Sequence, residues 1–421
     1  MKCRHCHTPL QHPFLDLGSA PHSNGFLTEQ QRQQPEPYFP LRLHVCDTCW
    51  LVQTEDFAAA DQLFTQDYAY FSSFSSSWLK HAADYSAMIT ERLNLDQHSL
   101  VVELASNDGY LLKNFVAANI PCLGIEPTAS TAAAAEALGV PVLREFFGEA
   151  LGRQLAQEGK QADLIAGNNV IAHVPDINDF VRGMARLLKH DGVITLEFPH
   201  LLQLVQQCQF DTIYHEHFSY LSLGTLKRIF EAQDLCIFDV EQLSTHGGSL
   251  RIYGQHRSAM RPSTAAVASI LDLETTAGMN SLQFYSGFQS SVDRIKKDLC
   301  QFLKQAKDDG KTVAAYGAAA KGNTLFNYCG IESDLIEYVV DQSPHKQGKY
   351  LPGSHIQIFS PEQIKATQPD YVVILPWNIQ QEIMEQLSYI TDWSGLFVTA
   401  IPSLTLKNAL SIPETEEADR E

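Results

Sequence analysis

The chain contains 421 residues, of which 44% are hydrophobic and 19% are charged. This length exceeds what one ordinary hydrophobic core covers, so we expect a globular protein of two or three domains. The 49 acidic residues outnumber the 30 lysines and arginines, and the formal net charge of −19 argues against a protein that holds a long nucleic acid by its phosphates. The N-terminus lacks the apolar core of a signal peptide, and no apolar run is long enough to cross a bilayer. We therefore expect a cytoplasmic protein without a membrane partner. We also expect a monomer, although no motif of the sequence determines the oligomeric state.

Two C-x-x-C pairs, Cys3 with Cys6 and Cys46 with Cys49, stand about forty residues apart near the N-terminus. In a reducing cytoplasm such pairs favour metal binding over disulfides, and four thiolates on two knuckles suit tetrahedral zinc. The alternating segment 41–45 predicts a strand that leads into the second knuckle. A site with four protein ligands is closed, so we expect structural zinc far from the chemistry. Spare candidate ligands on the same segments are His5, His7 and His44.

Residues 99–109 predict the first strand and loop of a doubly wound α/β sheet, with a helix from Tyr110 onward. A second strand, over 122–127, ends in an acid that can accept both ribose hydroxyls of an adenosine, and further strands are expected over 163–169 and 193–198. The loop does not read G-x-G-x-x-G and is poorly shaped for a pyrophosphate, which favours S-adenosylmethionine over NAD. The candidate cofactor-binding residues are Glu103, Ser106, Asn107, Asp108, Gly109, Glu126 and Asn168.

The stretch 214–220, with the sequence YHEHFSY, gathers a phenol, two imidazoles and a carboxylate within four positions. These groups cover acid, base and hydrogen-bond donor roles near neutral pH, and such neighbours shift one another's pKa values. An extended segment would put His215 and His217 on one side and Tyr214 and Glu216 on the other, whereas a turn would bring Tyr214 and His217 to one face. A polar loop with a satisfied histidine is the structural alternative.

Two more segments are expected to bring polar side chains to the site. His173 comes just after the strand 163–169, at the sheet edge where ligands bind in such folds. The segment 246–253 joins a glycine turn to a strand, and it can bring Arg251 or its own backbone amides near an anion. A β-turn that leads into an edge strand explains the same residues equally well.

The C-terminal part predicts a second, smaller Rossmann-like unit. An amphipathic helix is expected over 284–307, and strands are expected over 312–316, 336–341 and 371–378. The glycine-bounded loop 317–324 opens a helix, and backbone amides beside a lysine suit a phosphate there, although simple packing with a solvated lysine also explains it. The candidate substrate-binding residues are Gly317, Lys321, Gly322, Asn323 and Arg251.

Taken in order, these motifs resemble the S-adenosylmethionine-dependent C-methyltransferases of deoxysugar biosynthesis, which act on dTDP-linked 4-keto-6-deoxy sugars. The resemblance covers essentially the whole chain. It includes the four-cysteine module, the segment 103–110 (Glu-x-x-Ser-Asn-Asp-Gly-Tyr), the YHEHFSY stretch and the segment 316–322 (YGAAAKG). A single motif would be weak, but four in the same order are specific.

The resemblance implies that His217 is the catalytic base, with Tyr214, Glu216 and His173 completing the site. The chemistry suits these residues, because a proton on carbon beside a ketone is acidic only when the resulting enolate is stabilised. That step requires a positioned base and a hydrogen-bond donor near the carbonyl oxygen. From the residues alone Glu216 stays open as the base, although a carboxylate needs burial to become basic enough. The implied ligands are S-adenosylmethionine, structural zinc and a dTDP-linked keto sugar.

The resemblance also divides the chain. It places Tyr68 and Tyr70 near the methyl donor, although core packing explains this aromatic patch equally well. Residues 257–278 are rich in serine, threonine and alanine and are expected to form a linker into the domain that binds the nucleotide. The predicted parts are a zinc-binding domain over 1–70, an S-adenosylmethionine-dependent methyltransferase domain over 71–256, a Rossmann-like nucleotide-sugar-binding domain over 257–410 and an acidic disordered tail over 411–421.

Two other functions stay open from the sequence. A methyltransferase that acts on the hydroxyl or amine of another small acceptor would need no enolate and no keto sugar. A non-catalytic binding protein would use the zinc module and the cofactor fold for partner recognition. A catalytically dead homologue should have lost the titratable cluster, which this chain keeps.

Overall fold

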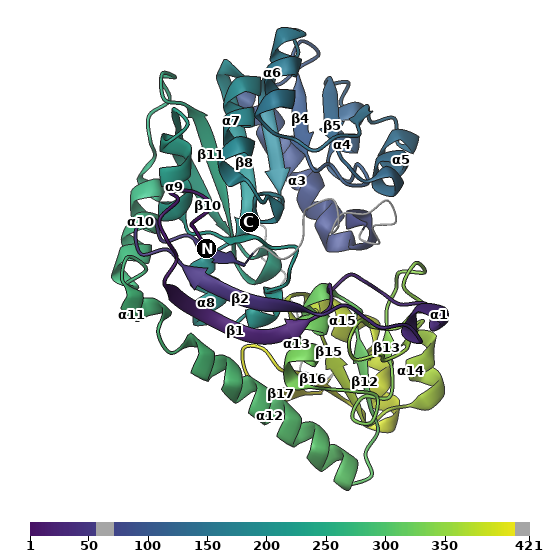
Figure 1. The fold of residues 1–421 in the computed structure, drawn as a ribbon. Coiled ribbons are helices and arrows are strands. Elements are labelled where there is room, and N and C mark those ends of the chain that lie inside the picture. Colours follow the sequence, from purple (N-terminus) through teal and green to yellow (C-terminus); the bar gives the residue numbers. More distant parts are fainter. Residues whose placement is uncertain (56–70, 409–421) are drawn as a thin grey trace, which may run out of the picture. The chain divides into compact units, whose positions relative to one another are not determined.

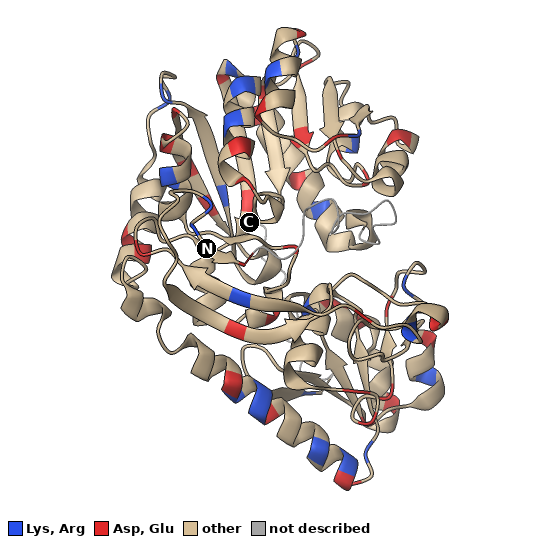
Figure 2. Cartoon of the chain, in the orientation of Figure 1, with Lys and Arg blue, Asp and Glu red and all other residues tan. Residues whose placement is uncertain are grey.

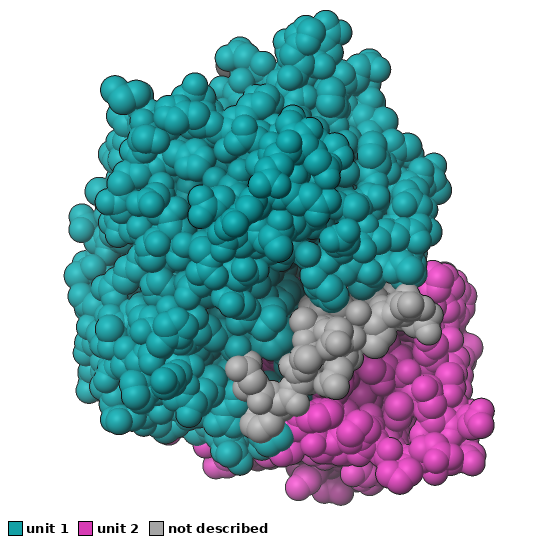
Figure 3. Space-filling model, turned by 45° about the horizontal axis from the view of Figure 1, so that its top comes forward, with its two compact units in different colours: residues 1–18, 40–206, 215–289 teal, residues 19–39, 207–214, 290–421 magenta. Residues whose placement is uncertain are grey.

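The computed structural model describes residues 1–55 and 71–408. Contacts within the chain divide it into two compact units, each assembled from three separate segments (Figures 1 and 3). These two units are fewer than the four parts predicted from the sequence. The residue borders of those four parts stay a prediction. The first unit comprises residues 1–18, 40–206 and 215–289, and the second comprises residues 19–39, 207–214 and 290–421.

The first unit contains a seven-stranded sheet with the order β10-β11-β8-β7-β4-β5-β6. The strands from β8 to β6 run parallel, and β11 and β10 add an antiparallel edge. All four residues of the central strand β4 are buried, as expected for a parallel sheet covered on both faces. The predicted doubly wound α/β architecture is confirmed. The strands are β4 (Val101–Leu104), β5 (Cys122–Ile125), β6 (Val142–Leu143), β7 (Ala162–Asn168), β8 (Leu188–Pro199), β10 (Leu235–Leu243) and β11 (Ser249–His256).

Helix α3 (Ser76–Leu93) precedes this sheet. The Ser75 side chain caps it by accepting a hydrogen bond from the Trp78 amide, and Asn94 ends it in the left-handed conformation. The other described α-helices of the first unit are α4 (Leu112–Ala117), α5 (Ala129–Ala137), α6 (Glu149–Gln157), α7 (Ile177–Leu187), α8 (Leu201–Gln206), α9 (Leu223–Glu231), α10 (Ala265–Thr276) and α11 (Leu282–Tyr285).

The expectation of a linker over 257–278 is wrong, because helix α10 lies within it. The alanine content of the segment had been interpreted as typical of a linker, but alanine is also the strongest helix former. Val267 and Ile270 are buried on one face of the helix, and Glu274, one turn further along, is buried as well. The Glu274 carboxylate accepts hydrogen bonds of 2.6 and 2.9 Å from two backbone amides at the start of α9. These contacts make α10 part of the first unit.

A four-stranded sheet carries the N-terminal cysteine pairs and has the order β1-β2-β3-β9. Strand β2 confirms the strand predicted over 41–45. Strand β9 is formed by the last two residues of the YHEHFSY stretch, so this sheet joins the stretch to the N-terminal module. The strands are β1 (His12–Ala20), β2 (Phe39–Val45), β3 (Val52–Thr54) and β9 (Ser219–Tyr220).

The second unit contains a six-stranded sheet with the order β14-β13-β12-β15-β16-β17. Its strands run parallel except β17, which is antiparallel to β16, and the predicted second Rossmann-like unit is therefore confirmed. The strands are β12 (Val313–Tyr316), β13 (Val339–Val340), β14 (Ile358–Phe359), β15 (Tyr371–Ile374), β16 (Leu396–Thr399) and β17 (Thr405–Lys407). The shorter α-helices are α1 (Glu29–Arg32), α13 (Ala320–Cys329), α14 (Glu362–Thr367) and α15 (Gln380–Gln386).

Helix α12 (Phe288–Asp308) is the amphipathic helix predicted over 284–307, although the chain first forms the short helix α11. Acidic and basic residues are interspersed along α12 in Figure 2. Its apolar residues, in contrast, recur at helical spacing and pack into the interior. The buried apolar residues of the helix are Phe288, Val292, Ile295, Leu299, Leu303 and Ala306.

The described residues also form six short 3-10 helices. These are η1 (Ser72–Phe74), η2 (Ile171–His173), η3 (Phe210–Thr212), η4 (Thr245–Gly247), η5 (Trp377–Ile379) and η6 (Ser388–Trp393). Within the described residues, no helix has both the length and the apolar character needed to span a bilayer.

Candidate active site and metal centre

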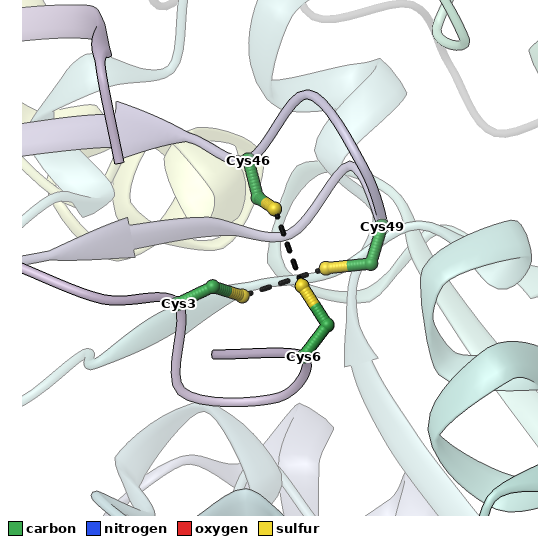
Figure 4. Close-up of side chains that lie close together, drawn as sticks. All are labelled: Cys3, Cys6, Cys46 and Cys49. Atoms are coloured by element: carbon green, nitrogen blue, oxygen red, sulfur yellow. Dashed lines mark hydrogen bonds between the residues drawn. The ribbon is translucent and has the colours of Figure 1, made fainter. Parts of the chain in front are cut away.

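The four predicted zinc ligands lie together (Figure 4). The Sγ atoms of Cys3, Cys6, Cys46 and Cys49 are all within 4.8 Å of one another. The Sγ–Sγ distance is 3.5 Å both between Cys3 and Cys49 and between Cys6 and Cys46. Tetrahedral zinc with bonds of about 2.3 Å places its sulfur ligands about 3.8 Å apart. The cluster therefore fits the ion with little rearrangement.

Each cysteine pair lies on the same kind of turn. His7 and Trp50 occupy equivalent positions in the two turns, and both have left-handed backbones with φ of 61° and 64°. Their amides donate to the carbonyls of Cys3 and Cys46 at 3.0 and 2.9 Å. Glycine, the residue that usually occupies such positions, is absent from both, so only the C-x-x-C spacing marked these knuckles in the sequence.

The zinc module lies next to the predicted catalytic stretch, which corrects the expectation that zinc would be far from the chemistry. Strand β3 pairs with β9 through Val52 with Tyr220 and Gln53 with Ser219. The paired residues of β9 come directly after His217 and Phe218 in the chain. The expectation had rested on closed coordination, which keeps an ion from touching substrate but does not fix its distance from the site.

The predicted cofactor loop follows β4 and is tightly coiled. Ala105 and Asn107 have φ of 56° and 49°, and Gly109 has φ of 77°. The hydroxyl of Ser106 and Oδ1 of Asp108 are buried and have no hydrogen-bonding partner among the described residues. Buried polar atoms are normally paired, and the ammonium and hydroxyl groups of S-adenosylmethionine offer the donors that these acceptors lack.

The carboxyl group of Glu103 is fully buried near the end of β4. Burial raises the pKa of Glu103 well above its ordinary value, and the charges of Asp108 and Glu126 act in the same direction. The Tyr110 hydroxyl lies beside this carboxyl group, and Asn168 Nδ2, at the end of β7, donates to that hydroxyl at 3.3 Å. A cationic group bound here would favour the ionised form of Glu103, so the ends of β4 and β7 offer a site for a cation.

Helix η1 packs on the cofactor loop. The Ser72 amide donates to Asn107 Oδ1 at 2.9 Å, and the Ser73 amide donates to Asp108 Oδ2 at 3.0 Å. The segment that follows the predicted tyrosine pair is therefore attached to this loop. Tyr68 and Tyr70 lie outside the described residues, and their role stays a prediction.

Glu126 comes directly after β5 and is 4% exposed. Its Oε2 accepts a hydrogen bond from the Asn107 amide at 2.9 Å, and its Oε1 accepts one from the Thr128 amide at 2.9 Å and one from the Thr128 hydroxyl. The carboxylate thus ties the cofactor loop to the chain that enters α5. These contacts add a structural role to the residue that is predicted to hold the ribose.

We expect Glu126→Ala to weaken the binding of S-adenosylmethionine by about 1–3 kcal/mol, the range for losing hydrogen bonds to a charged group. Isothermal titration calorimetry of the two proteins measures this difference directly. Glu145→Ala, which removes an exposed carboxylate shortly after β6, is the matched control and should bind the cofactor normally. Unchanged affinity in Glu126→Ala would refute the placement of the ribose.

Two of the predicted catalytic residues contact each other. The rings of His217 and His173 have centroids 4.5 Å apart and planes at 79°, an edge-to-face arrangement. The Phe218 amide donates to the Ala172 carbonyl at 2.7 Å, which joins the main chains beside the two histidines. Residues 215–216 form a turn, so the extended arrangement of the stretch does not occur.

The environment of His173 keeps it uncharged. Burial lowers the pKa of His173 to about 4, while a hydrogen bond to the main chain of Glu216 acts in the opposite direction. The Glu216 residue itself is 3% exposed. Tyr214 is the last residue of its segment in the second unit, whereas the chain from His215 onward belongs to the first. The border between the two segments therefore falls within the YHEHFSY stretch.

The structure reveals a buried polar cluster that the sequence reasoning missed, centred on Glu197 of β8. This carboxylate accepts hydrogen bonds from Thr245 Oγ1 at 2.7 Å and from Arg251 at 2.9 Å, and His81 Nε2 lies 2.8 Å from it. Burial alone would raise the pKa of Glu197, but these partners outweigh it and lower the pKa. Arg251 also pairs with Glu241 at 3.1 Å, so the predicted anion ligand is engaged within the sheet. Glu197 itself was the available signal in the sequence, because it is an acidic residue within an apolar strand, as Glu103 is.

Close packing shapes the loop before α13. Gly317 has φ of 93°, and a Cβ atom there would lie 2.5 Å from the Pro376 ring. A Cβ atom on Gly322 would lie 2.6 Å from the Leu375 side chain. The positive φ and the Pro376 ring therefore favour glycine at position 317, whatever ligand the loop holds. Gly322 lies in the first turn of α13, where a larger residue would require the Leu375 side chain to move.

Lys321 belongs to a partly buried cluster in the second unit. Its Nζ donates to Asn378 Oδ1 at 2.6 Å and lies 4.7 Å from the centre of the Trp377 ring. Trp377 Nε1 donates to Asp211 Oδ2 at 2.7 Å. Burial raises the pKa of Asp211 to about 7 and lowers that of Lys321 to about 8, and each charge moderates the shift of the other. Asn323 is buried and donates to a main-chain carbonyl at 2.5 Å.

Comparisons with known proteins agree with this architecture. Three family descriptions match the chain: a zinc binding domain over residues 3–64, a methyltransferase domain over residues 78–240 and a C-methyltransferase C-terminal domain over residues 244–402. The C-methyltransferase NovU of Streptomyces niveus is 35% identical over 401 residues, which make up 95% of each chain.

Solved structures with partial similarity include two methyltransferases. An S-adenosylmethionine-dependent methyltransferase from Anabaena variabilis is 13% identical, with a TM-score of 0.36 over 48% of this chain and 96% of that one. Magnesium protoporphyrin IX methyltransferase from Synechocystis, solved with bound S-adenosylmethionine, is 14% identical, with a TM-score of 0.32 over 42% of this chain and 78% of that one. The matches along the sequence extend over nearly its whole length, and the four-cysteine cluster and the α/β sheet agree with them. The chain therefore belongs to the C-methyltransferase family, and it is an S-adenosylmethionine-dependent enzyme with a structural zinc site.

Proposed function

We propose that this enzyme methylates a carbon atom next to the ketone of a dTDP-linked 4-keto-6-deoxy sugar, by way of an enolate. The observation that carries the proposal is the pair of His217 and His173, whose rings are 4.5 Å apart just beyond the carboxyl end of β7. Ligands of doubly wound sheets bind at this edge. A C-methyltransferase needs a base for a weakly acidic C–H bond, and the pair offers one.

His217 is the proposed base, because histidine accepts protons near neutral pH. When His217 takes the proton it becomes a cation. The pKa of His173, lowered to about 4 by burial, leaves that neighbour neutral, so the new charge meets no repulsion from it. Tyr214 is the proposed donor to the enolate oxygen, and Glu216 is the alternative base.

The rest of the chain is proposed to bind the two ligands. Glu103, Glu126 and the loop between β4 and α4 would hold S-adenosylmethionine. Its sulfonium methyl group would be the electrophile for the enolate carbon, and S-adenosylhomocysteine would be the leaving group. The loop before α13 and Lys321 are proposed to bind the diphosphate of the sugar nucleotide. The end of β12 and the N-terminus of α13 support this proposal, because backbone amides at a helix N-terminus favour anions.

Deuterium exchange tests the proposal without the methyl donor. The enzyme is incubated with a dTDP-4-keto-6-deoxy sugar in D₂O, and mass spectrometry follows the loss of the proton at the acceptor carbon. We expect washout that depends on the enzyme, followed by methyl transfer to that carbon once S-adenosylmethionine is added. A methyltransferase for hydroxyl or amine acceptors would give no washout, and a non-catalytic binding protein would give neither washout nor transfer.

A further inference from the structure

Strand β3 of the zinc module runs directly alongside the end of the proposed catalytic stretch. The Thr54 amide donates to the Phe218 carbonyl at 3.1 Å, and the Thr54 hydroxyl donates to the His217 carbonyl at 3.3 Å. Thr54 is only 3% exposed. The main chain of the proposed base is thus hydrogen-bonded to a residue of the zinc module.

The first cysteine knuckle reaches the same place through Arg4, which lies between two zinc ligands in the chain. Its Nε donates to the Phe218 carbonyl at 3.4 Å, and its terminal nitrogen donates to the Thr54 carbonyl at 2.9 Å. The guanidinium group also lies over the Phe218 ring, 5.0 Å from the ring centre. Arg4 therefore holds both strands where β3 meets the stretch.

Gln53 connects this arrangement to the metal ligands. It is fully buried, its Oε1 accepts a hydrogen bond from the Arg4 amide at 2.9 Å, and its Nε2 donates to Cys3 Sγ at 3.3 Å. Groups that bond to metal ligands in this way fix the orientation of the ligands. A continuous series of contacts thus runs from a zinc ligand through Gln53 and Arg4 to the Phe218 carbonyl.

The opposite side of the stretch is fixed as well. The Phe218 amide donates to the Ala172 carbonyl at 2.7 Å, and Ala172 is the neighbour of His173 in η2. Phe218 therefore lies between the zinc module and η2. Its carbonyl accepts hydrogen bonds from the zinc module, and its amide donates one to η2. A shift of the zinc module would move the ring of His217 relative to that of His173.

We propose that the zinc module positions the catalytic base, with Arg4 and Thr54 as the positioning residues. The proposal rests on the proposed function, because it assumes that His217 removes the proton. Zinc closes the knuckle that presents Arg4, and Arg4 and Thr54 hold the main chain of His217 and Phe218 in the reactive geometry. A small misplacement of a catalytic group is costly even when folding and binding are intact.

Two variants test this proposal. Arg4→Met removes the guanidinium donors but keeps an apolar side chain against the Phe218 ring. Thr54→Val keeps the shape and the β-branched character of the strand residue and removes only the hydroxyl that reaches the His217 carbonyl. The matched control is Arg228→Met, which removes a 2.8 Å hydrogen bond to the Thr48 carbonyl on the second knuckle and does not touch the stretch through that bond.

In Arg4→Met we expect kcat and the rate of proton washout to fall about tenfold to a hundredfold, and in Thr54→Val by a smaller factor. The KM for the keto sugar, the affinity for S-adenosylmethionine, the zinc content and the Tm should stay near their wild-type values. The control should match the wild type in all of these measurements. Unchanged kcat in both variants would overturn the proposal, as would a loss of kcat that only follows a loss of zinc.

Hydrogen exchange measured without any substrate separates this proposal from the proposed function. Peptides that cover residues 50–55 and 215–221 should exchange faster in Arg4→Met than in the wild type or in Arg228→Met, because the Thr54 and Phe218 amides lie in the affected contacts. Exchange at the wild-type rate would overturn the positioning role. If the wild-type enzyme gives no proton washout from a dTDP-4-keto-6-deoxy sugar, the proposed function fails. Faster amide exchange in Arg4→Met would then support only the link between the zinc module and the stretch.

Discussion

His217→Asn is expected to lower kcat by roughly a hundredfold or more, the usual effect of losing a general base, and to abolish proton washout at the acceptor carbon. Asparagine can replace one hydrogen bond of the imidazole, so both ligands should still bind. It cannot accept a proton near neutral pH, so the proton transfer should fail. A steady-state assay of methyl transfer at saturating substrate gives kcat, and calorimetry checks the binding of each ligand. His215→Asn is the matched control, because this neighbour is a buried histidine of the same stretch whose ring donates to the Pro40 carbonyl at 3.2 Å.

Washout at the wild-type rate in His217→Asn would show that another residue is the base. The pH dependence of the wild-type rate then helps to identify it. A base works in its deprotonated form, so the rate falls as the pH drops through its pKa. Burial lowers the pKa of His173 to about 4, and a base with this identity would stay active well below pH 6. Loss of washout in Glu216→Gln would instead assign the role to that carboxylate.

The second large effect concerns the stability of the second unit. We expect Asp211→Asn to gain stability relative to the wild type as the pH rises from about 4 to 7, by up to about 4 kcal/mol. The folded protein raises the pKa of this carboxyl to about 7, whereas the unfolded chain ionises near pH 4. Between these values the folded state binds more protons than the unfolded state, so the wild type loses stability with rising pH. Asparagine does not ionise and removes this loss.

Urea unfolding at several pH values, followed by tryptophan fluorescence, measures this difference. Lys321→Met is the companion variant. Without the ammonium group the pKa of Asp211 should rise further, so the loss of stability should continue above pH 7. Parallel stability curves for the wild type and Asp211→Asn would show that the carboxyl titrates normally in the folded protein.

The sequence predicted those features that depend on local patterns. The C-x-x-C spacing identified all four cysteines of the cluster. The apolar runs that end in acids predicted the strands that carry Glu103 and precede Glu126, and the binding of the cofactor by these two residues stays a prediction. The prediction over 257–278 failed because alanine-rich composition is shared by linkers and helices, and the buried Glu274 that anchors α10 contacts residues far away in the chain.

Other features depend on partners that no local pattern reveals. Asp211 looks like an ordinary loop acid, and its environment is set by Trp377 and Lys321. Arg4 looks like a spacer between cysteines, and its contacts with Thr54 and Phe218 exist only because two very short strands pair. Strands of two or three residues carry almost no periodicity, so their pairing could not be predicted.

The construction of the second unit from separate segments has a consequence for synthesis on the ribosome. Residues 207–214 emerge long before the elements that receive them: Ile213 accepts a hydrogen bond from Thr324, and Asp211 accepts one from Trp377, 111 and 166 positions later. At about 5–20 residues per second, the second delay is roughly ten to thirty seconds. During this interval Asp211 and the Ile213 carbonyl lack these two native hydrogen bonds, so a nascent chain that stalls before α13 would expose residues 207–214 to chaperones and proteases.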